Sequence, residues 1–342
     1  MNLLPPETAR YSFPTVIVRV IRALIDSYDR GAGMSVGTAW DDPDLAAVLR
    51  APARKRLRQG LALLAESRGF PELRALRVRV LARGLTGRLK ELAAAPSDDP
   101  DAMLLLGTTR IHYAWNIRGG AYAEHVKRER FQRFWAELQH AQAPLLRAAD
   151  LLPPDPVPWD QLQRYAMGMQ LEREELDRVW HEVLWRAPSL YSAHCTRVQA
   201  ISAKWYGSDE EAAAFAEEVV DRAAPGDPVV AAAAAVHFEI AGRRIEDMSR
   251  CEAVLRSHFR DPAVTDLMVR AADRWLRSPM PHPRTPEAHH MFGAAFHFAG
   301  EEDRARHHLR QTDRRMPELL PWSVASLTPA RYYAKTRAAL GV

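Results

Sequence analysis

The chain has 342 residues, of which 47% are hydrophobic and 26% charged, and its formal net charge is +4 at neutral pH. These values are ordinary for a soluble globular protein, and the charge is mild for so long a chain. No run of roughly 18 apolar residues occurs, so we expect no transmembrane helix.

The N-terminal residues predict an extended arm followed by a helix. Residues 1–14 contain three prolines, and residues 15–29 place four aliphatic side chains on one helical face. Arg19 and Arg22 interrupt this apolar stretch and no basic region precedes it, so we expect no signal peptide. Residues 31–40 are rich in glycine, serine and threonine and predict a loop.

The next segment is strongly basic and helical. Asp42-Pro43 predicts a capped helix start, and further helices are expected at 53–67 and 71–94. The positive charge suits an anionic partner, which would be nucleic acid, an acidic protein or the acidic helix at 209–221. No DNA-binding motif accompanies it, so we prefer an ordinary solvated face. The expected anionic-partner patch consists of Arg54, Lys55, Arg56 and Arg58.

Residues 95–102, APSDDPDA, predict a linker with a second Asp-Pro helix start. We therefore divide the chain into an N-terminal arginine-rich helical segment, 1–97, and a helical-repeat body, 98–342. The tail of the body predicts a terminal helix that covers the open end of a helical stack.

The body predicts helices throughout. The expected elements are a helix at 103–118, a long helix at about 125–149, hairpins at 159–188, 190–223 and 228–259, and a helix at 262–277. The run Ala231–Ala235 predicts a close-packed stripe in the third hairpin. Strand signals are nearly absent, so the predicted fold class is all-α.

Residues 286–317 give the clearest hairpin. The sequence predicts two short helices joined at Gly300, with Gly293 allowing close approach and with Phe296 and Leu309 filling the seam. The spacing of these residues, with Ala305 on the second helix, is similar to a tetratricopeptide repeat, whose period is about 34 residues. This resemblance implies a tetratricopeptide-like α-solenoid with an N-terminal helical segment.

A second resemblance covers residues 102–225. The string Lys204-Trp205-x-Gly207-Ser208 and the helix end from Trp115 to Arg118-Gly119 resemble an uncharacterised family of bacterial, mostly actinobacterial, helical-repeat proteins. The resemblance implies a tetratricopeptide-like fold. It implies no activity, because the family has no agreed function.

No catalytic or metal-binding pattern is complete. His181-Glu182 resembles a zinc-peptidase helix, but Trp185 stands where the second histidine is needed. The histidine group at 289, 290, 297, 307 and 308 lies on a repeat hairpin, where we favour solvated positions over a metal site. Ser208 with Glu211 predicts a helix-capping box instead of a nucleophile. We expect no metal and no cofactor, and we prefer a protein without enzymatic activity.

Three functions stay open. The preferred one is a non-catalytic scaffold that binds a protein or peptide in its concave groove through Trp115, Arg118, Lys204 and Trp205. A small-molecule or enzymatic pocket near His112 and Tyr113, between the N-terminal helices and the repeats, is the first alternative. Nucleic-acid regulation through the arginine-rich segment is the second. We expect a cytoplasmic protein, because the two cysteines show no metal or redox spacing. The oligomeric state is not indicated.

Overall fold

The computed structural model describes residues 28–119, 128–205 and 207–342, apart from the side chains of residues 53 and 54. Of the described residues 72% are helical, and the strands among them are limited to the pair β1 (Ser35–Val36) and β2 (Arg315–Met316). The predicted all-α fold class is therefore confirmed. None of the described helices combines the length and apolar character needed to cross a bilayer.

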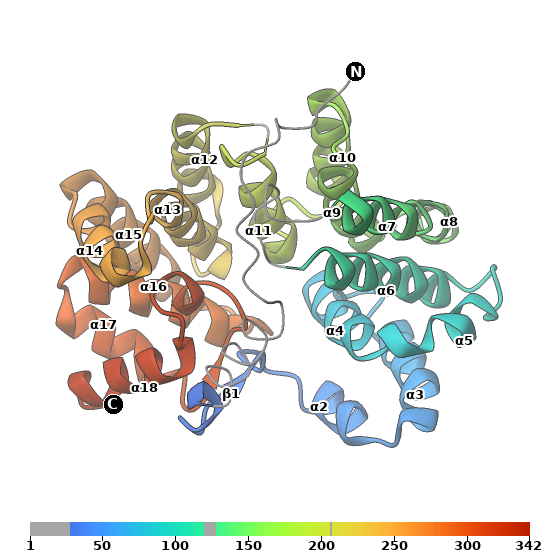
Figure 1. Cartoon of the computed structure of the whole chain (residues 1–342), viewed down its shortest axis with the longest axis horizontal. Helices are drawn as coiled ribbons and strands as arrows, with labels where there is room; N and C mark the ends of the chain where they lie inside the picture. Colours follow the sequence, from blue (N-terminus) through green and yellow to red (C-terminus); the bar gives the residue numbers. More distant parts are fainter. Residues whose placement is uncertain (1–27, 120–127, 206) are drawn as a thin grey trace.

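The helices are arranged in two groups (Figure 1). In chain order they are α2 (Pro43–Arg50), α3 (Ala53–Glu66), α4 (Pro71–Gly84), α5 (Leu89–Ala93), α6 (Pro100–Arg118), α7 (Arg128–Gln139), α8 (Gln142–Leu151), α9 (Val157–Met169), α10 (Arg173–Arg186), α11 (Tyr191–Ala200), α12 (Asp209–Arg222), α13 (Ala231–Arg243), α14 (Cys251–Phe259), α15 (Pro262–Leu276), α16 (Thr285–Ala299), α17 (Glu302–Leu309) and α18 (Pro329–Leu340). The helix expected at 15–29 lies almost wholly outside the described residues.

Local signals account for several helix ends. The Asp42 carboxylate accepts a hydrogen bond from the Leu45 amide at 3.0 Å and so caps α2, as the Asp-Pro start predicts. Ser208 Oγ accepts from the Glu211 amide at 3.1 Å and caps α12. The Glu211 carboxylate pairs with Arg173 of α10, so its side chain links two hairpins.

Two expected helix boundaries are wrong. The helix expected at about 125–149 is divided into α7 and α8 by a turn at 140–141, and this division lets both pieces pack on α6. Leu145 of α8 lies so close to α6 that a Cβ on Gly107 would be 2.5 Å from its Cγ. The helix expected at 71–94 ends at Gly84, and a short 3-10 turn precedes α5.

The hairpin of α16 and α17 has the predicted seam. Gly300 adopts a left-handed conformation, with φ of 89°, and ends α16. A Cβ on Gly293 would lie 2.4 Å from Leu309 Cδ2, so this glycine lets the two helices approach. Phe296, Ala305 and Leu309 are fully buried there.

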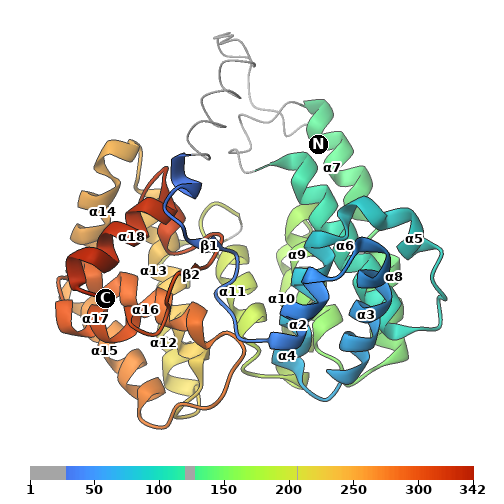
Figure 2. The ribbon, with the colours of Figure 1, turned by 90° about the horizontal axis from the view of Figure 1, so that it is seen from below.

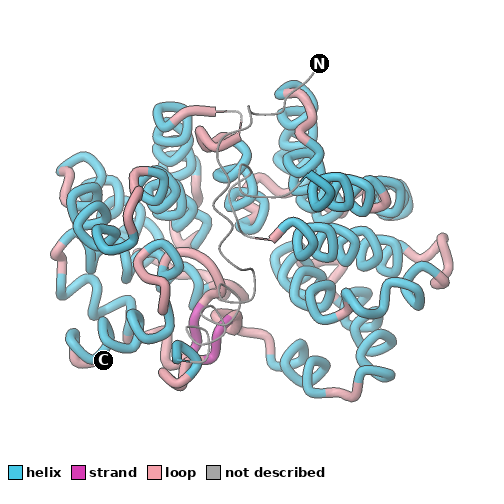
Figure 3. The backbone as a smooth tube through the Cα atoms, viewed as in Figure 1, coloured by secondary structure: helices cyan, strands magenta, loops and turns pink. Residues whose placement is uncertain are grey.

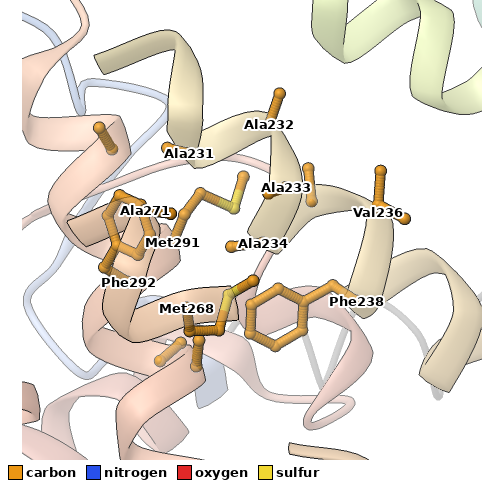
Figure 4. Packing of buried hydrophobic residues seen from close by; sticks show 14 of the residues in the cluster. Ala231, Ala232, Ala233, Ala234, Val236, Phe238, Met268, Ala271, Met291 and Phe292 are labelled. Atoms are coloured by element: carbon orange, nitrogen blue, oxygen red, sulfur yellow. The ribbon is translucent and has the colours of Figure 1, made fainter. Parts of the chain in front are cut away.

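The buried hydrophobic residues form two clusters, one built from residues 45–193 and the other from residues 191–340. The two groups of helices lie side by side, with α11 between them (Figures 1 and 2). Figure 4 shows the alanine stripe of α13 in the second cluster, close to Phe238, Met268 and Phe292. The domain boundary expected at 97/98 falls inside the first cluster, because α4 and α5 pack on α6.

The N-terminal part of the described chain also joins the two groups. The strand β1 pairs in parallel with β2, which follows α17 (Figure 3). Arg315 Nη1 lies 2.6 Å from Asp41 Oδ1, and the Asp29 carboxylate accepts from the Arg331 amide at 2.9 Å. The segment predicted as a loop therefore connects the C-terminal helices to α2.

Candidate functional site

Three of the residues predicted to bind a partner come together at one place. The rings of Trp115, on α6, and Trp205, after α11, are 6.2 Å apart and nearly perpendicular. The Arg118 guanidinium lies 5.2 Å from the Trp115 ring centre, and Phe134 of α7 packs 5.1 Å from that ring. Trp115, Trp205 and Arg118 are each half-buried. We call these three residues and Phe134 the aromatic cluster.

The other residues of the Lys-Trp-x-Gly-Ser string have structural contacts. Lys204 Nζ lies 2.6 Å from Glu239 Oε2 of α13. A Cβ on Gly207 would lie 1.9 Å from the Ile201 carbonyl oxygen, so the backbone packing there requires glycine. Ser208 caps α12. Among the described residues of the string, Trp205 is therefore the one whose side chain is not already explained by an ion pair, a backbone packing requirement or a helix cap.

The predicted pocket residue His112 is half-buried, and its Nε2 atom is fully buried. Burial lowers the pKa of His112 well below its usual value, and the charges of Arg164 and Arg79 lower it further. The imidazole is therefore neutral at physiological pH. Its neighbour Tyr113 is half-buried. Arg164 and Arg79, which lower the pKa of His112, belong to a group of polar side chains that the sequence did not predict.

This group, which we call the interior arginine cluster, consists of Arg79 of α4, Asp160 and Arg164 of α9, Arg284 next to α16, and Glu287 of α16. The charges of all three arginines act on Asp160, which places the five side chains in one electrostatic neighbourhood. The helices α4 and α9 belong to the first hydrophobic cluster and α16 to the second, so the arginines come from both groups of helices.

Asp160 is the best-satisfied member of the cluster. Its side chain is 1% exposed. Ser192 Oγ donates to Oδ2 at 2.8 Å, Gln161 Nε2 donates to the same oxygen at 3.1 Å, and Thr196 Oγ1 donates to Oδ1 at 3.4 Å. Burial raises the pKa of Asp160, while the Ser192 hydrogen bond and the arginine charges oppose the rise.

The arginines are not satisfied to the same degree. Arg284 Nη1 donates to Glu287 Oε2 at 2.8 Å. Among the described residues, Arg284 Nε, Arg284 Nη2 and Arg164 Nε are buried without a hydrogen-bond partner. Arg79 and Arg164 form no ion pair within residues 28–119, 128–205 and 207–342. Burial and then the charge of Arg79 lower the pKa of Arg164 to about 9.

Neutral polar groups border the arginines. His112 Nε2 and the Tyr191 hydroxyl are buried and have no hydrogen-bond partner in the described part of the chain. Cys195 lies nearby on α11, and burial raises the pKa of its thiol to about 12. A thiol with this pKa stays protonated at neutral pH and is a poor nucleophile. The cluster therefore contains no activated thiolate at Cys195.

The expected anionic-partner patch is only partly a free surface. Lys55 and Arg58 are exposed, whereas Arg56 Nη2 donates to the Leu49 carbonyl at 2.8 Å at the end of α2. The side chain of Arg54 lies outside the described residues. Arg74 and Arg77 of the same basic segment are buried in ion pairs with aspartates.

The expectation that the histidine group is solvated is wrong for its central members. His290 donates from Nε2 to the Arg315 carbonyl at 2.8 Å and accepts at Nδ1 from Trp322 at 2.9 Å, so both ring nitrogens are occupied. His289 and His308 face each other with their Nδ1 atoms 2.9 Å apart. In the described part of the chain no three histidine, cysteine or acidic residues are grouped as metal ligands.

One shallow surface hollow of about 270 Å³ lies at the end of α10, lined by Pro153, Pro154, Trp185 and Arg186. Trp185 is 79% exposed, and the Arg186 guanidinium lies 5.0 Å from the rings of both Trp185 and Trp159. The hollow lacks buried unpaired charge, so it is a weaker candidate than the interior arginine cluster.

No protein-family model, no curated protein and no solved structure matches this chain. The resemblances to the tetratricopeptide repeat and to the actinobacterial family therefore stay predictions. What can be inferred about function rests on the two clusters described above.

Proposed function

We propose that this protein binds a small polar molecule at the interior arginine cluster, between its two groups of helices. The observation that carries the proposal is the set of buried, unpartnered polar atoms there: His112 Nε2, Arg164 Nε, the Tyr191 hydroxyl, and Nε and Nη2 of Arg284. Buried polar atoms normally have hydrogen-bond partners, and groups of exceptions occur at functional sites.

Two further features support binding at this place. The polar atoms come from α6, α9, α11 and the segment before α16, so one ligand would contact elements from both hydrophobic clusters. Leaving such groups unpaired costs free energy, which a ligand with matching acceptors and donors recovers. The proposal needs no catalysis, and the preference for a non-enzyme stays a prediction.

The first test is a thermal-unfolding screen of the full chain against small polar metabolites sorted by charge. Mass spectrometry of molecules released from the purified protein by denaturation complements it. A ligand of this site raises the unfolding midpoint of the wild-type protein, and Tyr191→Phe weakens its binding about fivefold through one lost hydrogen bond.

Tyr165→Phe is the matched control, because Tyr165 is also buried but its hydroxyl donates to Gln142 Oε1 at 3.1 Å, away from the cluster. It leaves ligand affinity unchanged. If no compound class stabilises the protein, or if Tyr191→Phe and Tyr165→Phe bind a ligand equally well, the proposal is wrong.

The aromatic cluster supports a second candidate function, binding of a protein or peptide partner. Tryptophan and arginine dominate interface hot spots, and Trp115, Trp205 and Arg118 are half-buried at one place although Trp205 is distant in sequence from the other two. A partner captured by the wild-type protein is expected to be lost on Trp205→Ala and retained on Trp185→Ala. Equal capture by both variants would remove this candidate.

Three finer expectations belong to the same proposal. We propose that the hairpins follow the tetratricopeptide arrangement, on the support of the seam at Gly293 and Leu309. We propose a reducing, cytoplasmic location, because Cys195 and Cys251 are free thiols. Nucleic-acid binding receives less support, because Arg74 and Arg77 are buried in ion pairs.

A further inference from the structure

We infer that the ligand of the interior arginine cluster is a phosphate monoester, whose phosphate group is held by Arg79, Arg164 and Arg284. The inference rests on the proposed function and specifies the chemistry of its ligand.

The first argument is the excess of positive charge. Three guanidinium groups share the cluster with Asp160 and Glu287, and the nearby carboxylate of Glu72 also acts on Arg284. Glu287 is paired with Arg284, at 2.8 Å. Asp160 already accepts from Ser192, Gln161 and Thr196. Two arginines are left without an ionic partner in the described residues, and an enclosed anion removes that imbalance.

The second argument is the shape of the donors that remain. Nε and Nη2 form one edge of the planar guanidinium, and in Arg284 this whole edge is buried and unpartnered within the described chain. Arg164 offers its Nε in the same way. Such edges bind two oxygens of a phosphate or carboxylate at once. A phosphate has enough terminal oxygens for three guanidinium groups, whereas a carboxylate has two.

The third argument is the balance between ligand charge and site charge. Arg79 and Arg164, the two guanidinium groups of the cluster without an ion pair in the described residues, together carry two positive charges. A phosphate monoester is a dianion above its second pKa of about 6 and a monoanion below it. The dianion therefore matches the charge of these two guanidinium groups.

The neutral neighbours fit the organic part of such a ligand. The Tyr191 hydroxyl, His112 Nε2 and Gln161 Oε1 are buried and unpartnered in the described part of the chain, and they offer donors and acceptors without charge. Hydroxyl groups are the natural complement of such a set. We therefore expect the ester to carry hydroxyls, as sugar and glycerol phosphates do.

The test measures binding to the full-length protein by titration calorimetry at constant ionic strength. The probes are glucose 6-phosphate, glycerol 3-phosphate and inorganic phosphate, compared with succinate and acetate. We expect the phosphate esters to bind most tightly and to weaken at least about tenfold in Arg164→Gln, since a charge-assisted hydrogen bond is lost. Affinity should also fall as pH is lowered from 8 to 5.5, where the phosphate gains its second proton.

Arg58→Gln is the matched control, because Arg58 is exposed on α3. It leaves the affinity unchanged. A second readout does not depend on a ligand. Arg164→Gln raises the thermal midpoint of the free protein, since it removes a half-buried charge that has no ionic partner in the described residues and lies near the charges of Arg79 and Arg284.

The outcomes separate the two proposals. If succinate binds in an Arg164-dependent way and the phosphates do not, the ligand is a carboxylate. The phosphate inference is then overturned while the proposed function stands. If phosphates bind equally well to wild-type and Arg164→Gln, they bind elsewhere and the inference is overturned. If no small polar compound of any class binds, both proposals fail.

Discussion

Replacement of Arg74 by methionine should reveal how much the buried ion network of the first hydrophobic cluster contributes to stability. Arg74 is 0% exposed and lies 2.6 Å from carboxylate oxygens of both Asp101 and Asp155. It also donates to the Leu64 carbonyl at 2.7 Å. Asp101 and Asp155 are 2% and 3% exposed, so Arg74→Met leaves two enclosed carboxylates without this partner.

Breaking a buried pair by removing one partner typically costs about 3–5 kcal/mol. We expect a loss of that size in the free energy of unfolding, measured by urea titration at pH 7. Arg68→Met is the matched control. Arg68 also contacts Asp101, at 2.6 Å, but its side chain is 42% exposed, so its loss should cost at most about 1 kcal/mol.

The pH dependence gives the sharper check. Burial raises the pKa of Asp155, whereas the charge and hydrogen bond of Arg74 lower it. Without Arg74 the folded-state pKa rises further above the unfolded value, so the folded variant takes up a proton more readily as pH falls. The deficit of Arg74→Met relative to wild type should therefore shrink between pH 7 and pH 5. A deficit under 1 kcal/mol at pH 7, or one that grows on acidification, would refute the reasoning.

Two further perturbations test other parts of the fold. Gly293→Ala should destabilise the protein by about 1–3 kcal/mol in the same urea titration, because its Cβ would lie 2.4 Å from Leu309 Cδ2. The control Gly69→Ala should stay within about 0.5 kcal/mol of wild type, because no atom lies within 4 Å of its new Cβ. For His237 and His258, burial and neighbouring positive charge lower the pKa to about 4, so the unfolded state binds protons first and stability falls as pH drops from 6.5 toward 4. His258→Gln should remove up to about 1.4 kcal/mol per pH unit from that slope, and an unchanged slope would contradict the assignment.

Local patterns predicted much of the fold. The Asp42 and Ser208 caps, the stop at Gly119 and the seam of the last hairpin are all present, and each depends only on residues that are close to one another in the sequence. The broken helix at 140–141 was not predictable in this way. Its cause is the packing of α7 and α8 on α6, which depends on contacts between separate elements.

The candidate site was predicted only in part. The strings that contain Trp115 and Trp205 indicated two places of interest, but nothing in their spacing says that the rings meet at 6.2 Å. The sequence indicated a pocket at His112 but did not indicate the arginines that surround it. Arg284 carried no local signal, because its role depends on a meeting of α9 with the segment before α16. Arg164 did carry a usable signal, because it is an arginine between core residues of α9, Leu162, Tyr165 and Ala166.

The helix α4 contains two arginines with ion pairs and one without, and the proposed site depends on this difference. Arg74 and Arg77 point to carboxylates that their own hydrophobic cluster supplies, at 2.6 and 2.7 Å. Arg79 lies two residues after Arg77 in α4, and its charge acts on His112 of α6 and Arg164 of α9. Within the described residues it forms no ion pair with a carboxylate. A chain that neutralises two buried arginines of one helix and leaves the next beside Arg164, another cation, loses stability at that place. An anionic ligand restores the balance that the fold achieves by itself at Arg74 and Arg77.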